Sequence, residues 1–346
     1  MKKPSVSSRL AYLLVGLLLF GLAWQNLSAQ DEILPYQELI LEGQSLTFNE
    51  KYTQAQEKFQ ALIEKMPENP AGYFYLAMVY QAQMKDLESD LYQKEFHQNL
   101  NKVIELTKPK EEKKTANKWD LLFLGNAYGS LGYYQAKHGG WFSGFKLAKK
   151  AKGVLEKALQ QDSTFYEAYF GLGSYHYWRS IATKIFNWIP FIGDKREKGI
   201  KLLQIASERA VFFREPAQVA LIWIYFKEKR YSEALELVST LQGKYPEFKV
   251  PLWAKTFIYY ERYDWRNCLT VLDELEERIL QTQKDNFYNL IEVNFLKANC
   301  HYNLGHEKIC QKICQEILAY PLDEKIKERQ KEKLDKTKKL LKKCQK

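Results

Sequence analysis

Apolar and small side chains recur along most of this 346-residue chain at the spacing expected for one face of a helix. The stretch from Leu39 to Pro67 shows the pattern first, and its marked positions are Leu39, Gly43, Leu46, Tyr52, Ala55, Phe59, Leu62 and Pro67. Spacings of three and four residues indicate amphipathic helices. Small residues such as Gly43 and Ala55 suit places where two helices cross. The pattern predicts an all-α chain built from helix pairs.

These positions resemble the tetratricopeptide repeat (TPR), a helix-turn-helix unit of about 34 residues. The pattern returns to give about seven helix pairs, expected at residues 36–68, 70–109, 118–163, 166–212, 216–247, 249–281 and 288–322. The resemblance implies one elongated, right-handed superhelical solenoid over residues 30–322, in which each unit packs mainly on its neighbours. Such solenoids carry ligands on variable surfaces, so the resemblance does not identify the ligand.

Repeats three and four are longer than the others, because the second helix of each starts roughly 14 residues late for a TPR unit. We expect insertions between the paired helices, HGGWFSGFKLAKK at residues 138–150 and RSIATKIFNWIPFIGDKRE at residues 179–197. The second insertion either fills a gap in the superhelix or forms a hydrophobic lip against a partner or membrane. The lip would consist of Phe186, Trp188, Ile189 and Phe191. A Lys-rich stretch at residues 108–118 is expected to be an exposed connector.

Residues 190–203, PFIGDKREKGIKLL, carry a second, shorter resemblance. The stretch is similar to a GDR/K-x-x-G-L element in the eukaryotic inclusion-body-clearance TPR family. The matching positions are Gly193, Asp194, Lys195, Gly199 and Leu202 or Leu203. That family acts through interactions, so the resemblance implies a binding protein. The leader described next is a departure from that family.

The N-terminus has the layout of a secretory signal peptide over residues 1–29. A basic start precedes an apolar run from Leu10 to Trp24, and a polar stretch ends in Ser28 and Ala29, before the expected cut near Gln30. The apolar run is shorter than the roughly 20 residues that span a bilayer. We therefore expect an exported protein, periplasmic or secreted, with an uncleaved N-terminal membrane anchor as the alternative. The absence of Cys near the cut excludes a lipoprotein anchor there.

Positive charge is concentrated at the two ends of the chain. The net charge is +10, of which residues 323–346 contribute +6 and the first nine residues +3, leaving the repeats near +1. A groove that tracks nucleic-acid phosphates is therefore not expected. The tail at 323–346 predicts a basic C-terminal capping helix, with attraction to anionic lipids as the alternative.

No sequence motif indicates catalysis or cofactor binding. GxSxG, HExxH, Walker and GxGxxG patterns are absent, so we expect no enzyme activity and no cofactor. The histidines are scattered, and Cys310 and Cys314 lack a common zinc spacing, so no metal site is expected. We expect Cys268, Cys310 and Cys314 to be buried packing residues. A Cys300–Cys310 disulfide is the alternative if their Cα atoms lie within about 7 Å.

Aromatic residues make up 14% of the chain, and they supply the candidate binding surface. In TPR solenoids the first helix of each pair lines the concave groove, which here implies Phe74, Phe170, Tyr177, Trp223, Phe226, Trp253, Phe257 and Tyr260. The sequence predicts a non-enzymatic scaffold that binds a protein or peptide in this groove, with the two insertions forming a wall at one end. The alternatives are a membrane-associated assembly factor, held by the N-terminus and basic tail, and a groove that stacks on polysaccharide or another small ligand.

Overall fold

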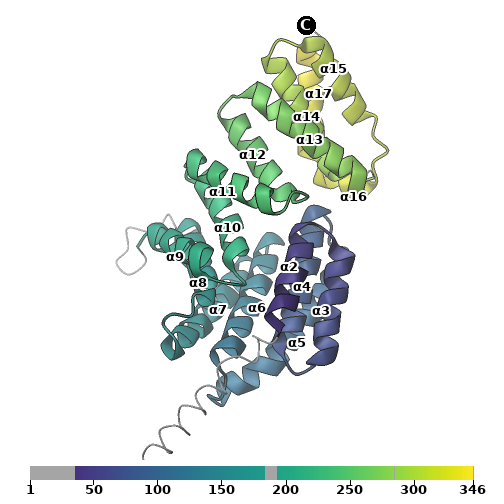
Figure 1. The fold of residues 1–346 in the computed structure, drawn as a ribbon. Coiled ribbons are helices and arrows are strands. Elements are labelled where there is room, and N and C mark those ends of the chain that lie inside the picture. Colours follow the sequence, from purple (N-terminus) through teal and green to yellow (C-terminus); the bar gives the residue numbers. More distant parts are fainter. Residues whose placement is uncertain (1–35, 184–192, 284, 346) are drawn as a thin grey trace, which may run out of the picture.

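A computed structural model describes residues 36–183, 193–283 and 285–345. Every regular element in these ranges is a helix, and seven consecutive pairs stack along the chain before two C-terminal helices (Figure 1). The pairs are α2/α3 (Gln37–Phe48, Tyr52–Lys65), α4/α5 (Pro70–Asp86, Gln93–Glu112), α6/α7 (Lys118–Lys137, Trp141–Gln161), α8/α9 (Glu167–Ala182, Arg196–Arg209), α10/α11 (Arg214–Lys227, Tyr231–Lys244), α12/α13 (Lys249–Glu261, Trp265–Gln283) and α14/α15 (Phe287–Asn303, Glu307–Leu318). The prediction of an all-α solenoid of helix pairs is confirmed.

Small residues set the distance between paired helices. A Cβ atom on Gly43 would lie 2.5 Å from the ring of Phe59, and one on Gly125 would lie 2.6 Å from Leu155. At α8/α9, a Cβ on Gly173 would lie 2.8 Å from the carbonyl oxygen of Gly199. Larger residues at these places would push the helices apart. The recurring small residues in the sequence are therefore contacts between helices.

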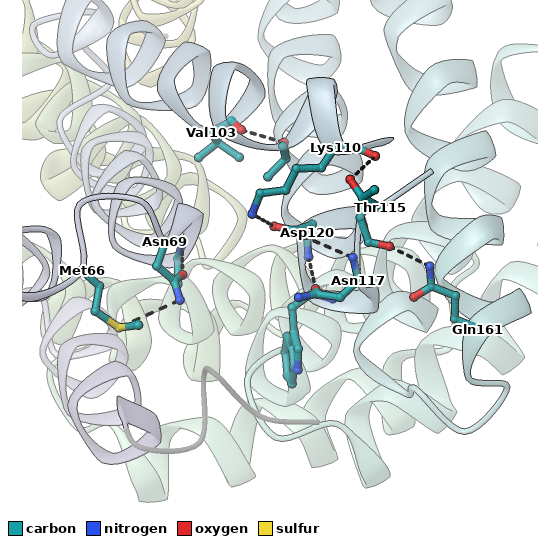
Figure 2. Close-up of polar contacts among 12 residues, drawn as sticks. Met66, Asn69, Val103, Lys110, Thr115, Asn117, Asp120 and Gln161 are labelled. Carbon is teal, nitrogen blue, oxygen red and sulfur yellow. Dashed lines mark hydrogen bonds and ion pairs between the residues drawn. The ribbon is translucent and has the colours of Figure 1, made fainter. Parts of the chain in front are cut away.

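The connector before α6 is shorter than predicted, because α5 continues to Glu112 with Pro109 inside it. The prediction that residues 108–118 form a loop is wrong for the helical part of that stretch. A capping box then starts α6 (Figure 2): the Asn117 side chain accepts hydrogen bonds from two backbone N–H groups, both at 2.9 Å. The Asp120 carboxylate accepts from the Asn117 N–H at 3.3 Å and pairs with Lys110 at 2.9 Å. These contacts hold the turn between the second and third repeats.

Repeat three contains no insertion between its helices, and that prediction is wrong. The extra residues lengthen both helices, so that α6 has 20 residues and α7 has 21. Only residues 138–140 lie between them, with Gly139 at a φ of +85° that favours glycine. In repeat four, α8 ends at Ala182 and α9 begins at Arg196. The predicted lip residues Phe186, Trp188, Ile189 and Phe191 lie outside the described residues.

The solenoid also makes contacts between repeats that are distant in the sequence, and the first two repeats lie beside the fifth to seventh (Figure 1). The Gln44 amide donates to the Phe212 carbonyl oxygen at 2.8 Å. The ring of Phe48 lies 4.9 Å from that of Tyr245 and 5.4 Å from that of Phe248, measured between centroids. The sequence pattern predicted that each repeat packs mainly on its neighbours, and the structure adds contacts between repeats that are far apart in the sequence.

A second contact joins the end of α4 to the C-terminal repeats. The Asn289 amide donates to the Asp86 carbonyl oxygen at 2.7 Å, and the Asn286 amide donates to the Leu87 carbonyl oxygen at 3.1 Å. The Arg329 guanidinium lies 3.1 Å from the Glu88 carboxylate. Part of the basic tail is therefore held by an ion pair within the chain.

The tail folds as two helices, α16 (Glu324–Arg329) and α17 (Lys331–Cys344), where the sequence predicted one. Thr337, Leu340 and Cys344 of α17 are buried, and α17 packs on α15. Its remaining side chains are polar apart from Leu334 and Leu341, which are partly buried against the same core. Among the described residues, no helix combines the length and apolar character needed to cross a bilayer.

Candidate peptide-binding groove

Helices α10 and α12 bring four predicted groove rings into contact. We call Trp223, Phe226, Trp253 and Phe257 the ring cluster. The centroid of Phe257 lies 6.2 Å from Trp223, 6.3 Å from Phe226 and 5.8 Å from Trp253, and the last pair is stacked at 23°. All four side chains are half-buried. The ring cluster is therefore fixed by packing and still presents apolar surface to solvent.

The two helices that carry the ring cluster begin at carboxylates from other repeats. Before α10, the Glu167 carboxylate accepts hydrogen bonds from the N–H groups of Val211 at 2.6 Å and Phe213 at 3.0 Å. At the start of α12, the Glu50 carboxylate accepts from the Lys249 N–H at 2.8 Å. A helix N-terminus has unpaired N–H groups and a partial positive charge, so a carboxylate stabilises it. Glu167 and Glu50 thus fix where the ring-bearing helices start.

Glu50 belongs to a buried ion cluster with Lys249 and Asp86. The side chains of these three residues are 9%, 2% and 10% exposed, and Lys249 pairs with both carboxylates. Burial raises the pKa of Glu50 to about 7, the nearby Asp86 charge raises it further, and the Lys249 ammonium opposes both effects. Burial also raises the pKa of Asp86. The cluster ties repeats one and two to the start of α12.

Two predicted groove residues are in the core instead. Phe74 is 2% exposed and Tyr177 is 0% exposed, so neither reaches a groove surface, and the prediction is wrong for both. The ring of Phe74 packs 5.4 Å from that of Phe123 in the next repeat. The Tyr177 hydroxyl donates to the Glu228 carboxylate at 2.8 Å. Each ring fills space between repeats, which an aromatic pattern cannot distinguish from groove lining.

Phe170 and Tyr260 are half-buried but contact other rings. Phe170 stacks on Phe213 at 5.2 Å, and Tyr260 meets Trp265 edge-on at 5.3 Å. Burial raises the pKa of Tyr260 to about 12. The structure therefore brings four of the eight predicted groove residues into one cluster of rings, and no sequence pattern indicated the carboxylates that position them.

In the part of the chain that the structure describes, no group of three or more His, Cys, Asp or Glu side chains is placed to hold a metal ion. The five cysteines are free and buried. Cys310 lies against Cys344, with 2.6 Å between the Sγ atoms, and not against Cys300 as the sequence alternative required. The Cys300 side chain instead contacts Cys268. A shallow depression of about 410 Å³ lies on α3 and α4 and contains no ring-cluster residue.

Comparison with known proteins supports the fold. No family model matches the sequence, and no curated protein is significantly similar to it. Among solved structures, the APC/C hetero-tetramer Cut9–Hcn1 is similar with a TM-score of 0.52 and 12% identity over 85% of this chain. This chain spans about half of that one, 48%.

Two bacterial TPR proteins are also similar. One, from Thermus thermophilus, has a TM-score of 0.40 and 17% identity over 64% of this chain and 98% of its own. The C-terminal part of the other, from Cytophaga hutchinsonii, has a TM-score of 0.41 and 19% identity, covering 83% and 97% of the two chains. With its stacked helix pairs and small residues at the crossings, the chain has the tetratricopeptide repeat fold.

Proposed function

We propose that this chain is an exported, non-enzymatic scaffold that binds an extended segment of a protein partner on the ring cluster. The observation that carries the proposal is the contact of four half-buried rings on two adjacent first helices, α10 and α12. Rings in such a setting anchor apolar or aromatic side chains, and a few of them supply most of the binding energy.

The rigid setting of the rings favours this use. Trp223 and Phe257 contact each other across the two helices, and both helices start at carboxylates from other repeats. A preorganised surface loses little conformational entropy when a ligand binds. The repeats are close to electrically neutral, which suits a peptide recognised by apolar side chains better than one recognised by its charge.

Export rests on the sequence of residues 1–29, which the structure does not describe. Fractionation of producing cells, with N-terminal sequencing of the recovered protein, tests it. A mature N-terminus near Gln30 in the exported fraction is expected. Recovery of uncleaved protein in the membrane fraction would favour the anchored alternative.

Capture from native envelope extract tests the binding site. The bait is residues 30–346, beside a variant with Trp253→Ala and Phe257→Ala. The control is Tyr263→Ala, which removes a ring that is 75% exposed and lies outside the cluster. All three proteins are compared by circular dichroism and thermal unfolding, because Trp253 and Phe257 also pack on the core.

A protein partner captured by wild type and the control, and reduced at least tenfold in affinity for the ring-cluster variant, supports the proposal. Equal capture by all three baits rejects the ring cluster as the site. A glycan array run with the same proteins tests the alternative that the ligand is a polysaccharide. Glycan binding that depends on the ring cluster would show that the ligand is a polysaccharide and not a peptide.

A further inference from the structure

The tip of the α6/α7 hairpin exposes three large rings. Trp141 is 72% exposed, Phe142 is 86% exposed and Phe145 is 41% exposed, all in the first turns of α7. Large apolar side chains grouped in this way on a surface indicate an interaction site. We call these residues the hairpin-tip rings.

The hairpin does not use these rings for its own packing. Where α6 and α7 meet, a Cβ atom on Gly144 would lie 2.7 Å from the Gly132 carbonyl oxygen and 3.1 Å from the Ala136 Cβ. The Ser143 hydroxyl donates to the Gly140 carbonyl oxygen at 2.9 Å and helps to close the turn. Small residues therefore hold the tip together, and the hairpin-tip rings remain free for another surface.

Lysines follow the rings along α7. Lys146, Lys149 and Lys150 are exposed, and none of them pairs with a carboxylate in the described ranges. The next lysine, Lys152, does pair, with Glu156 at 2.6 Å. The sequence between Asp120 and Glu156 contains no acidic residue. The hairpin tip is thus apolar at its end and basic along α7, while on its α6 side His138 and Lys137 face the carboxylates of Asp90 and Glu88.

The order of rings and charges fits a lipid surface. With a helical rise of about 1.5 Å per residue, Lys146 lies about 6 Å along the axis from Phe142, and Lys149 and Lys150 lie one turn further. Interfacial elements place rings about 5–10 Å into the headgroup and acyl boundary, while flanking lysines reach the phosphates. We propose that the α6/α7 hairpin tip docks on the surface of an anionic phospholipid bilayer, with the hairpin-tip rings inserted and the three lysines at the phosphates.

Vesicle flotation tests this docking with residues 30–346, which include all the packed repeats and lack the apolar run at residues 10–24. The vesicles are phosphatidylcholine, with and without phosphatidylglycerol. One variant carries Trp141→Ala and Phe142→Ala, and a second carries Lys146→Ala, Lys149→Ala and Lys150→Ala. Tyr263→Ala is the control, because its ring is equally exposed and lies on the α12–α13 turn.

Wild type and the control are expected to float with the anionic vesicles and not with the neutral ones. Removing the two rings should lower the partition coefficient at least tenfold, and each lysine removed should lower it about fivefold. Absence of flotation with anionic vesicles, or flotation that the ring variant leaves unchanged, would overturn the proposal. Flotation lost only on changing Lys342 and Lys343 to Ala would assign lipid binding to the tail and also overturn it.

A separate observation concerns two thiols at the C-terminal end. The Sγ atoms of Cys310 in α15 and Cys344 in α17 lie 2.6 Å apart, close to the covalent S–S distance of about 2.05 Å. Cys344 is the last residue of α17 and is 8% exposed, whereas Cys310 is fully buried. The end of a helix frays, so Cys344 is the thiol that a reagent reaches first.

We infer that Cys310 and Cys344 form a disulfide when the protein meets a disulfide oxidant such as oxidised glutathione. The Cys344 thiolate attacks one sulfur of the oxidant, forms a mixed disulfide and releases one glutathione thiolate. The Cys310 thiolate then attacks the Cys344 sulfur and releases the second. Two cysteine thiols lose two protons and two electrons, and the oxidant becomes two thiols. The bond covalently fixes α17, the capping helix, to the last repeat.

Alkylation in denaturant after oxidation tests this pairing. Of the five cysteines, three should be alkylated. Trypsin cuts after Lys312 and so separates Cys310 from Cys314, and the linked peptides should contain Cys310 and Cys344. In the Cys344→Ser variant, all four remaining cysteines should be alkylated. Five alkylated cysteines in the wild type, or a link that joins Cys268 to Cys300 or involves Cys314, which also contacts Cys310, would overturn the assignment.

Discussion

The ammonium group of Lys249 lies 3.2 Å from the carboxylate of Asp86, although the two residues belong to the sixth and second repeats. Lys249 also pairs with Glu50 of the first repeat. All three side chains are at most 10% exposed, so one buried lysine balances two carboxylates. The contact of the first two repeats with the sixth repeat therefore involves charged side chains that are almost fully shielded from solvent.

Replacing Lys249 by Ala should destabilise the protein strongly, because it leaves Glu50 and Asp86 buried without their cation. Removing one partner of a buried ion pair costs about 3–5 kcal/mol. Urea unfolding followed by circular dichroism measures the change. The control is Lys312→Ala, which removes an exposed pair with Glu316 and should cost less than about 1 kcal/mol. Similar losses in the two variants would show that the cluster does not stabilise the fold.

Glu50 should make stability fall as the pH rises from about 4.5 to 7. Its pKa is raised from 4.5 to about 7 in the folded protein, mainly by burial. Between these values the folded state holds more protons than the unfolded state, so the free energy of unfolding decreases with pH, by at most about 1.4 kcal/mol per pH unit. The raised pKa of Asp86 acts in the same direction.

The measurement is the unfolding free energy of wild type, Glu50→Gln and the exposed-residue control Glu57→Gln from pH 4.5 to 8. Relative to Glu50→Gln, the free energy of unfolding of the wild type should fall up to about pH 7, and above that pH the two curves should be parallel. Curves that are parallel over the whole range would contradict the raised pKa.

His176 should have the opposite pH dependence. It is buried, its Nδ1 atom has no hydrogen-bond partner, and burial together with nearby lysines lowers its pKa from 6.5 to about 4. Between these values the unfolded state holds more protons, so stability is lost as the pH falls from 6.5 towards 4. His176→Gln should remove this acid sensitivity, while His306→Gln, at an exposed position, should retain it. Equal acid sensitivity in the two variants would refute the assignment.

Replacing two glycines by alanine should change the stability of the protein in opposite directions. A Cβ on Gly199 would lie 2.7 Å from both the Gly173 carbonyl oxygen and the Tyr177 backbone nitrogen, so Gly199→Ala should separate α8 from α9 and cost about 1–3 kcal/mol. Gly153 lies in α7 with no atom near its missing Cβ. Gly153→Ala should therefore stabilise the protein by about 0.5–1 kcal/mol. Thermal unfolding of both variants tests the contrast, and stabilisation by Gly199→Ala would contradict this packing.

The helix pairs were predictable from the sequence because their signal is local. Apolar spacing marks each helix face, and small residues such as Gly43 and Ala55 mark the crossings. In repeat three, which is longer than the usual unit, the predicted insertion between the paired helices is wrong. The extra residues of repeat three continue α6 and α7, because nothing between them except Gly139 and Gly140 breaks a helix.

The sequence by itself determined the fold class, the seven helix pairs and a set of aromatic candidates. Only the tertiary structure decided which rings share a surface, because burial depends on neighbours in other repeats: Tyr177 is enclosed, whereas Trp253 and Phe257 stay half-buried. It also decided which distant repeats touch, since Glu50 and Lys249 are 199 residues apart and no local pattern joins them. Periodicity reports contacts within a helix pair; contacts between distant repeats follow from how successive pairs stack.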